Sequence, residues 1–421
     1  MAVSRVTASM TFEQLLREHA IYPAFQPIVR LDDGEVVAFE ALARGPAGTP
    51  WVSPAALFTE AYRVGKAIEL DRVCRQVAVR SFADAGMPES IVLFINIEPM
   101  TFGSPYPSGA VEQWADLDAA RRRVILEITE RSVTTAPAEM LLAVASARRN
   151  SIGVAIDDVG ADPASLAMMP LVRPDVIKLD LTLVQQASSR ATARIVGAVA
   201  AEAERTGAAV LAEGIESDHH LHVARSMGAT LGQGFYFGLP EASPSPPPAP
   251  RRPLALPPFV DDTEMSTPFA TVHEGRLSQG TERLLAPLSR HLESQGLDAM
   301  DPIVLLACFQ DVSRFRAKTR RRYEELAERG VFTAVLGRNM PTEPGLGIRG
   351  ARLEPGDPIT DEWAVIALGA QFAAALLARE RRDDRGVFDF VVTHDREAVI
   401  AAARPVIRRI VASYGGEGDR D

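Results

Sequence analysis

The chain has little cysteine and no excess of basic residues. Cys74 and Cys308 are the only cysteines among 421 residues, so the sequence offers no disulfide framework, which indicates a cytoplasmic protein. Its 45 lysines and arginines are outnumbered by 55 aspartates and glutamates, giving a net charge of −10. Because duplex nucleic acid is bound through basic surface, we expect no duplex partner and allow only a local basic pocket for a small phosphate ligand.

Long apolar runs are also missing. The N-terminus has no apolar core of the kind found in a signal peptide. Residues 363–378 form the longest nearly apolar stretch, but Gly369 and Gln371 interrupt it, and it is shorter than the roughly 20 residues that a membrane span needs. We therefore expect no membrane span, and we interpret this stretch as a buried helix or as a strand followed by a helix.

Two adjacent carboxylates follow an apolar run in Val154-Ala155-Ile156-Asp157-Asp158-Val159-Gly160. Such a run indicates a buried strand that ends at a polar site. Neighbouring carboxylates repel each other unless positive charge lies between them, and a divalent cation is the common source of that charge. Taken alone, the pair is better explained as a solvated turn or a helix cap, so a metal site needs further residues.

Four other apolar runs end in a polar side chain in the same way. The steps between successive polar residues are 31, 30, 21 and 35 residues, and each step can hold a strand and a crossover helix. Helices are expected at 136–150 and 191–206. This alternation favours a parallel sheet, and functional residues at the carboxyl ends of all its strands favour a (β/α)8 barrel, with an open doubly wound sheet as the alternative. The residues that end the runs are Asn96, Glu127, Asp157, Lys178 and Glu213.

An earlier segment carries a family signature. Asp32-Asp33-Gly34 separates two apolar runs and predicts a hairpin, and the second run continues as Glu40-Ala41-Leu42-Ala43-Arg44. Glu40-Ala41-Leu42 followed by Arg44 resembles the signature of the EAL-domain cyclic-di-GMP phosphodiesterases. Other motifs of that family follow in register, so that the resemblance covers about residues 10–240: Phe94-Ile95-Asn96, Leu126-Glu127-Ile128-Thr129-Glu130, Asp157-Asp158-Val159-Gly160, Val176-Ile177-Lys178-Leu179-Asp180, Ala212-Glu213-Gly214-Ile215-Glu216 and Gly232-Gln233-Gly234-Phe235.

The resemblance implies a modified (β/α)8 barrel of the TIM type that binds two Mg²⁺ or Mn²⁺ ions and hydrolyses cyclic-di-GMP to linear pGpG. It also implies a homodimer through the barrel. Hard cations prefer oxygen ligands, which fits the implied metal shell, with Asp157 as the bridging ligand. The resemblance implies three groups of site residues: metal ligands Glu40, Asn96, Glu127, Asp157 and Asp158; catalytic residues Glu213, Lys178 and Glu130, the last in a supporting role; and substrate contacts Gln26, Arg44, Gln233 and Glu216.

One loop departs from the family pattern. After the paired aspartates most members have Phe-Gly, a small residue, Gly-Tyr and a Ser-rich turn, whereas this chain has Val159-Gly160-Ala161-Asp162-Pro163. In the family this loop positions the second metal and couples dimerisation to activity. Because proline fixes its own φ and restricts the preceding residue, a weak or inactive receptor that binds cyclic-di-GMP and acts through protein partners is a second interpretation. A scaffold is a third, but it leaves the acidic set unexplained, because unpaired buried carboxylates destabilise a fold.

A proline-rich segment divides the chain. Residues 241–258 contain eight prolines, which is typical of a semi-rigid spacer. We therefore expect the barrel over 1–240, a linker over 241–261, a smaller α/β domain over 262–413 and a tail over 414–421. In the second domain the patterns predict helices at 282–295, 313–328 and 395–413, and strands at 302–309, 331–337, 363–368 and 387–393.

Motifs in this second domain resemble the DICT domain, a sensory module found with cyclic-di-GMP enzymes and two-component proteins. The resemblance implies that the domain senses a ligand or protein partner of unknown identity and regulates the barrel. Asp395 is best explained as the cap of the last helix. The motifs are Phe309-Gln310, Asp361-Glu362-Trp363 with Leu368-Gly369, and Phe390-Val391-Val392-Thr393-His394-Asp395-Arg396-Glu397.

Overall fold

The computed structural model describes residues 10–98, 123–160, 163–186, 189–255, 266–272, 277–298 and 303–410. Several expectations therefore fall outside the described residues. Asp162 of the altered loop is one of them, and so are the expected domain boundaries at 261, 262 and 413 and the expected tail at 414–421.

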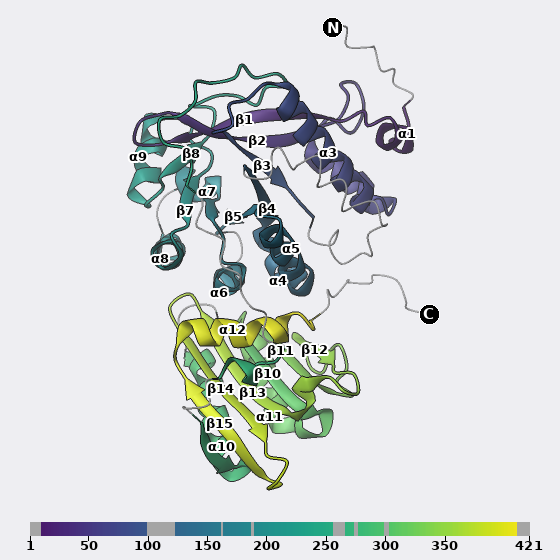
Figure 1. The fold of residues 1–421 in the computed structure, drawn as a ribbon, viewed down its shortest axis with the longest axis vertical. Coiled ribbons are helices and arrows are strands. Elements are labelled where there is room, and N and C mark those ends of the chain that lie inside the picture. The colour runs from purple at the N-terminus through teal and green to yellow at the C-terminus, as the bar shows by residue number, and fades with distance from the viewer. Residues whose placement is uncertain are drawn as a thin grey trace.

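A closed barrel forms the first part of the structure (Figure 1). Strands β2 to β8 are parallel, whereas β1 pairs antiparallel with β2 on one side and with β8 on the other. The predicted hairpin produces this reversed first strand, and its pairing with β8 closes the sheet. The modified (β/α)8 barrel is thus confirmed and the open doubly wound sheet is wrong. The barrel strands are β1 (Tyr22–Arg30), β2 (Val36–Arg44), β3 (Val92–Asn96), β4 (Val124–Thr129), β5 (Gly153–Val159), β6 (Val176–Leu179), β7 (Ala209–Ala212) and β8 (Leu231–Gln233).

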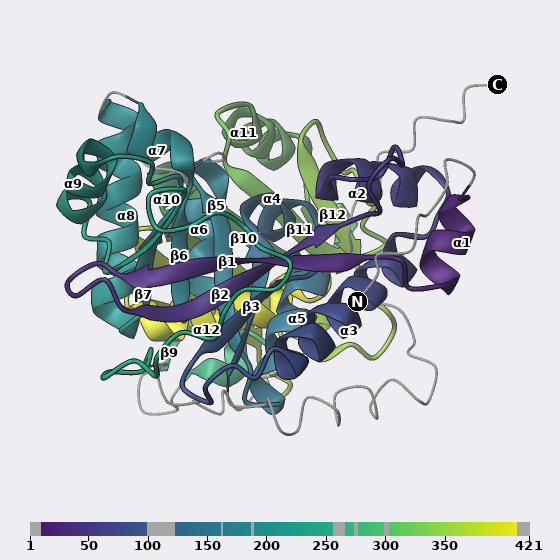
Figure 2. The same ribbon diagram turned by 90° about the horizontal axis from the view of Figure 1, so that it is seen from above.

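Helices surround this barrel, as Figure 2 shows from above. The helices expected at 136–150 and 191–206 are confirmed as α5 and α8. A capping box at Ser189 starts α8, and Gly207, whose φ of 78° is left-handed, ends it. The helices of this part are α1 (Phe12–Arg17), α2 (Pro54–Arg63), α3 (Ala67–Asp84), α4 (Glu130–Thr135), α5 (Pro137–Arg149), α6 (Pro163–Val172), α7 (Leu181–Gln185), α8 (Arg190–Thr206) and α9 (Asp218–Ser226).

The interior of the barrel is an apolar plug with a polar layer above it. Successive side chains of a strand point to opposite faces, so residues two apart share a face. Ala38 is followed two residues later by Glu40, Ile125 by Glu127, and so on around the barrel. The apolar members of this inward set, which pack together, include Ile28, Ala38, Val92, Phe94, Ile125, Ala155, Val176, Leu211 and Leu231.

A seven-stranded sheet with the order β12-β11-β10-β13-β14-β15-β9 forms the second part. Helices α10 and α11 pack on one face of this sheet, and α12 packs on the other (Figure 1). The predicted α/β domain after the barrel is confirmed. Its elements are η3 (Phe269–Thr271), β9 (Ser278–Thr281), α10 (Glu282–Asp298), β10 (Ile303–Asp311), η5 (Val312–Arg314), α11 (Ala317–Glu328), β11 (Phe332–Arg338), β12 (Ile348–Arg352), η6 (Pro358–Asp361), β13 (Glu362–Gly369), β14 (Ala373–Glu380), β15 (Val387–Thr393) and α12 (Arg396–Ile407).

The nearly apolar stretch at 363–378 differs from its expected structure. It contains no helix; β13 and β14 form an antiparallel hairpin there, with Trp363 opposite Ala378. Pairing of β13 with β10 and of β14 with β15 outweighs the helix propensity of its alanines. The helix expected at 313–328 is also shorter, because η5 precedes α11, whereas Asp395 caps α12 as predicted by accepting a hydrogen bond from the Ala398 N–H.

The two parts pack against each other through α6. This helix contacts β10 and β13 of the second sheet, and α12 contacts α5 and α6 (Figure 1). One hydrophobic cluster includes Leu171 from α6 together with Leu306 and Ile366 from the second sheet. Polar contacts of the described residues cross the same boundary: Arg404 Nη2 donates to the Leu171 carbonyl over 3.3 Å, and Arg349 Nη1 donates to the Thr135 carbonyl over 3.3 Å. Arg205 Nη1 lies 2.5 Å from Glu397 Oε1. A conformational change in the second domain can therefore be transmitted to α6 through this packing.

The described part of the proline-rich segment lies along the first hairpin. Arg252 Nη2 is 2.5 Å from Asp32 Oδ2 and 3.1 Å from Asp33 Oδ2, and the backbone N–H of Arg251 donates to Glu35 Oε2 over 2.9 Å. These contacts hold the segment against the turn of the β1–β2 hairpin. Among the helices of the described residues, none combines the length and hydrophobicity that crossing a membrane requires.

Candidate active site

The carboxyl ends of the parallel strands bring acidic side chains together at one end of the barrel. Glu40, Glu127 and Asp157 each place a carboxylate oxygen within 4.8 Å of the others. Asp157, Asp158 and Glu213 form a second group that meets the same limit. Asp157 belongs to both groups, so the two acidic groups adjoin and share one carboxylate.

Lys178 lies at the centre of these carboxylates and is completely buried. Its Nζ is 2.6 Å from Glu127 Oε1, 2.7 Å from Asp157 Oδ1, 2.8 Å from Glu213 Oε1 and 3.5 Å from Glu40 Oε2. One ammonium thus faces four carboxylates, and Asp158 adds a fifth carboxylate nearby. This excess of negative charge favours binding of further cations.

An irregularity in β5 explains how two consecutive aspartates serve one site. In a regular strand Asp157 and Asp158 would point to opposite faces. The pairing of β5 with β6 shifts register between Ile156 and Val159, and Asp158 adopts a left-handed φ of 59°. Aspartate tolerates this conformation better than most residues, and such a bulge redirects a side chain. Asp158 therefore joins Asp157 and Glu213 in the second acidic group.

Three amide side chains border the acidic groups. Asn96 Nδ2 donates to Glu40 Oε1 and to Glu127 Oε2, each over 3.0 Å. Gln233 Nε2 donates to Glu40 Oε2 over 2.7 Å and to Gln26 Oε1 over 3.1 Å. The Oε1 atom of Gln233 is buried and accepts no hydrogen bond from any described residue. A buried acceptor without a donor beside a cluster of carboxylates fits a cation or a substrate N–H.

Burial and charge shift the pKa values of these groups in different directions. Burial raises the pKa of Glu213 to about 8, despite the opposing charge of Lys178. Burial and then Asp157 raise the pKa of Asp158 to about 6, and burial with repulsion from Glu40 raises that of Glu127. Burial also opposes ionisation of Glu40, but Lys178 and the donated hydrogen bonds outweigh it and lower the pKa.

The ammonium of Lys178 stays charged for the same reason. Burial favours its neutral form, but the attraction of Asp157, Glu127, Glu213 and Glu40 outweighs burial and raises its pKa. The site therefore holds a permanent cation within a set of carboxylates of which some retain protons near neutral pH. Oxygen donors of this kind, with no cysteine or histidine among them, suit hard divalent cations such as Mg²⁺ and Mn²⁺.

Three of the predicted site residues lie apart from the acidic groups. Glu130 is buried, and its Oε1 accepts a hydrogen bond from the Gly160 N–H over 3.1 Å and another from the Ser165 hydroxyl. This carboxylate connects the start of α4 with the turn after β5 and with α6. Arg44 is half-buried and donates to the Ala43 carbonyl, and Glu216 is exposed on the loop after β7.

Glu130 and Ser165 show what the sequence did not reveal. The motif Leu126-Glu127-Ile128-Thr129-Glu130 suggested a supporting catalytic role for Glu130, and the structure adds that its carboxylate accepts hydrogen bonds from the Gly160 N–H and the Ser165 hydroxyl. Ser165 lies near the start of α6, just after the altered loop, and carried no assigned role. Glu130 and Ser165 are 35 positions apart in the sequence, and a contact over that separation leaves no local pattern. The contact between them could therefore not be inferred from periodicity or spacing.

Comparison with known proteins identifies the first part of the chain. Residues 10–240, more than half of the sequence, match the model of the EAL domain. The chain belongs to the EAL domain family. Residues 269–381 match the model of a sensory domain in diguanylate cyclases and two-component systems, so that the EAL barrel is followed by a DICT domain. Both resemblances inferred from the motifs are confirmed.

Relatives of the EAL barrel include proteins named as phosphodiesterases. Cyclic di-GMP phosphodiesterase RocR of Pseudomonas aeruginosa is 29% identical over 222 residues, which cover 51% of this chain and 56% of RocR. The probable cyclic di-GMP phosphodiesterase PdeG of Escherichia coli is 28% identical over 242 residues, which cover 55% of this chain and 48% of PdeG. The match thus spans about half the length of either relative.

Solved structures that are similar to part of this chain include BlrP1 of Klebsiella pneumoniae as a complex with manganese and cyclic-di-GMP. It is 29% identical, with a TM-score of 0.47, and the match covers 52% of this chain and 56% of BlrP1. A phosphodiesterase, PaMucR, in complex with cyclic-di-GMP is 22% identical, with a TM-score of 0.48, and the match covers 55% of this chain and 96% of that structure.

Proposed function

We propose that the barrel is a metal-dependent phosphodiesterase that hydrolyses cyclic-di-GMP to linear pGpG. The observation that carries this proposal is the pair of acidic groups that share Asp157. Two groups with one common carboxylate are what a pair of closely spaced cations requires, and such pairs recur in enzymes that cleave phosphate esters. The family membership and the names of the relatives support the same reaction and the same substrate.

Two Mg²⁺ or Mn²⁺ ions are the proposed cofactors. Glu40, Asn96, Glu127, Asp157 and Asp158 would hold them, with Asp157 common to both. When bound, the ions would neutralise charge on the phosphoryl oxygens and activate an attacking water. The chain contributes a largely buried set of oxygen donors, and the hydrogen bonds from Asn96 and Gln233 fix the orientation of the Glu40 carboxylate.

The remaining residues act on the proton and on the substrate. Glu213 accepts the proton of the attacking water, and its pKa of about 8 lies near neutrality, where a general base is most effective. Lys178 offsets negative charge on the phosphate. Glu130 acts as a positioning residue for the turn after β5. The proposed substrate contacts are Gln233 and Gln26 beside the acidic groups, Arg44 through its planar fork, and Glu216.

We further propose that the chain divides into the barrel at 1–240, a linker at 241–261 and the DICT domain at 262–413, and that the DICT domain regulates the barrel. The packing of α6 supports this proposal, because α6 follows the loop after Asp158 and contacts the second sheet. A cytoplasmic location fits the two free thiols. The homodimer implied by the family remains a proposal that light scattering on the full chain would test.

Turnover by the full-length chain tests the proposed activity. Purified protein is incubated with cyclic-di-GMP and Mn²⁺, and pGpG is followed by chromatography. We expect pGpG from the wild type and at least about a hundredfold less from Glu40→Gln, which keeps the shape of the side chain but removes its charge. Glu204→Gln makes the same chemical change at an exposed position of α8 and should leave turnover unchanged. Equal turnover by Glu40→Gln and wild type would contradict the proposal.

A receptor without turnover is the second candidate function. The observation that favours it is the sequence after the paired aspartates, where Asp162-Pro163 departs from the family pattern. Binding of cyclic-di-GMP by calorimetry with no pGpG in the turnover assay would select the receptor. Absence of both binding and turnover would leave the scaffold.

A further inference from the structure

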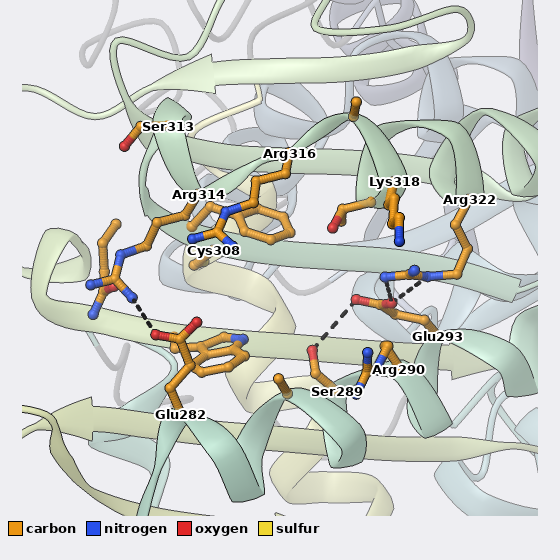
Figure 3. Close-up of a pocket in the computed structure, with 16 residues that line it drawn as sticks. Glu282, Ser289, Arg290, Glu293, Cys308, Ser313, Arg314, Arg316, Lys318 and Arg322 are labelled. Carbon is orange, nitrogen blue, oxygen red and sulfur yellow. Dashed lines mark hydrogen bonds and ion pairs between the residues drawn. The ribbon is translucent and has the colours of Figure 1, made fainter.

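A cavity lies in the DICT domain, apart from the acidic site of the barrel. Its volume is about 870 Å³, and α10, the end of β10, the segment that leads into α11, and Trp363 of β13 line it (Figure 3). Arg314, Arg316, Lys318 and Arg322 lie along one side of this cavity, opposite residues of α10 (Figure 3). Cavities of roughly 300–1,000 Å³ accommodate small organic ligands.

Positive charge dominates the lining of this cavity. It contains the cations Arg290, Arg314, Arg316, Lys318 and Arg322, but only the carboxylates Glu282 and Glu293. The charge of the lining is thus 5 minus 2, or +3, in a chain whose net charge is −10. Side chains of like charge repel one another when they converge, so this cluster favours an anion between them.

Among the described residues, the two carboxylates pair with only two of the cations. Glu293 is buried and accepts from Arg322 Nε over 2.6 Å, and Glu282 Oε2 is 3.9 Å from Arg314 Nη1. In the part of the chain that the structure describes, Arg290, Arg316 and Lys318 form no ion pair. Their donors are therefore available to a ligand.

The start of α11 adds a second attraction for an anion. This helix has 12 residues, its N-cap Arg316 makes no side-chain capping hydrogen bond, and its first turn contains no acidic residue. The first N–H groups of a helix lack acceptors within the helix and carry partial positive charge. Ala317, Lys318 and Thr319, which provide these groups, all line the cavity, so an anion there meets backbone donors and cationic side chains together.

Aromatic side chains supply a flat apolar surface beside these cations. Phe309 and Trp363 lie opposite each other on β10 and β13, are half-buried, and both line the cavity. Phe309 packs against Phe315 and Tyr323, and Trp363 packs edge-on against Phe388 at a centroid distance of 5.9 Å. These contacts hold the two rings in place, and held rings bind a flat ligand without a large loss of side-chain entropy.

We propose that this cavity binds a small organic anion that carries a flat aromatic ring, with a phosphate or carboxylate group directed at the start of α11. The cations and the helix N-terminus recognise the acidic group, and Phe309 and Trp363 contact the ring. The volume suits a ligand of about mononucleotide size. This site is independent of the acidic groups in the barrel and does not rest on the activity proposed for them.

Calorimetric titration of the full-length protein tests the site. EDTA is present throughout, so that metal-dependent binding to the barrel is removed. The probes are GMP, which combines ring and phosphate; guanosine, which lacks the anion; inorganic phosphate, which lacks the ring; and 4-hydroxybenzoate, an aromatic carboxylate. We expect GMP or 4-hydroxybenzoate to bind, and guanosine and phosphate to bind at least about tenfold more weakly. Whichever of the two aromatic anions binds identifies the source of the acidic group.

Two variants locate the binding. Arg316→Gln with Lys318→Gln should weaken binding of the aromatic anion at least about tenfold, because both substitutions remove charge-assisted contacts to its acidic group. Arg320→Gln with Arg321→Gln makes the same change on α11 at exposed residues outside the cavity and should leave binding within about twofold. Thermal unfolding confirms that both variants are folded, and Trp363→Leu provides an uncharged test of the ring contact.

Three results would overturn the proposal. The first is that neither GMP nor 4-hydroxybenzoate binds the wild type. The second is that inorganic phosphate binds as tightly as the aromatic anion, because the rings would then contribute nothing. The third is unchanged binding by the Arg316→Gln, Lys318→Gln variant, because the anion would then be bound elsewhere in the chain.

Discussion

The acidic site of the barrel and the basic cavity of the DICT domain use charge in opposite ways. In the barrel, four carboxylates surround one buried ammonium and a fifth, Asp158, lies nearby, all on side chains at the ends of several strands. In the DICT domain, the cavity cations that pair with no described carboxylate, Arg290, Arg316 and Lys318, are exposed on α10 and at the start of α11. The buried charges of the barrel site stabilise one another, whereas the charges of the DICT cavity face solvent and change the free energy of folding little.

This difference shows how each site relates to folding. The acidic groups adjoin the apolar plug of the barrel, so a change in their charge changes the stability of the whole fold. The basic cavity lies beside a core that is closed by apolar and aromatic packing, including the buried Tyr323. Substitutions in the cavity should therefore change binding, whereas substitutions in the acidic site should change stability as well.

The largest expected effect is on stability, and replacement of one lysine in each region measures it. Lys178→Met removes the cation at the centre of the carboxylates, and loss of one partner from a buried ionic network costs about 3–5 kcal/mol. In urea unfolding with EDTA we expect a loss of that order, and Mg²⁺ should restore part of it by supplying positive charge. Lys318→Met in the cavity should change the free energy of unfolding by less than about 0.5 kcal/mol. Equal stability of both variants would contradict the comparison.

The dependence of metal binding on pH is expected to be the next largest effect. The raised pKa values of Asp158, about 6, and Glu213, about 8, mean that protons compete with a cation below those values. The apparent Mg²⁺ affinity should therefore rise between about pH 6 and pH 8, by up to about tenfold per pH unit for each proton displaced. The shift in unfolding midpoint caused by Mg²⁺ at pH 6, 7 and 8 measures this rise, and a constant shift would contradict it.

The same groups set the stability of the metal-free protein. Because the folded pKa of Glu213 exceeds its unfolded value of 4.5, its contribution to stability is fully present below pH 4.5 and is lost as the pH rises through about 8. The metal-free protein should thus lose stability from this group over the range in which Mg²⁺ binding strengthens. Urea unfolding in EDTA between about pH 6 and pH 8 measures the loss of stability of the metal-free protein separately from the rise in Mg²⁺ affinity.

The smallest effect concerns the contact between the two domains. Glu397→Gln removes the ion pair with Arg205, but Arg205 keeps its contact with Glu202 at 2.5 Å. Glu397 is 59% exposed, and exposed ion pairs contribute about 0.2–1 kcal/mol. We expect a loss in this range by urea unfolding, because apolar packing of α6 on β10 and β13 holds the domains together. A loss above about 2 kcal/mol would show that the polar contact matters more than the packing.

Much of the barrel could be predicted from the sequence because its residues obey local rules. A short apolar run that ends in a polar side chain, as in Val154-Ala155-Ile156-Asp157, indicates a buried strand and its end. Repeated at steps of 21 to 35 residues, this pattern predicted the strands and the convergence of Glu127, Asp157 and Glu213. The hairpin at Asp32-Asp33-Gly34 likewise predicted the reversed first strand.

Features set by distant contacts could not be predicted in this way. The β13–β14 hairpin replaces the expected helix because β10 and β15 pair with it from outside the stretch. The contacts of Glu130 with Gly160 and Ser165 join separate elements. The central place of Lys178 among four carboxylates also depends on closure of the barrel, so its spacing along the chain could not reveal it.

The most direct test of the two-metal site is the number of Mn²⁺ ions bound per chain. Calorimetric titration of metal-free protein should give two ions for the wild type. Asp158→Asn, which alters only one of the acidic groups, should leave one tight ion, and Asp157→Asn should weaken both, because Asp157 belongs to both groups. A single ion in the wild type, or two ions retained by Asp157→Asn, would contradict the account.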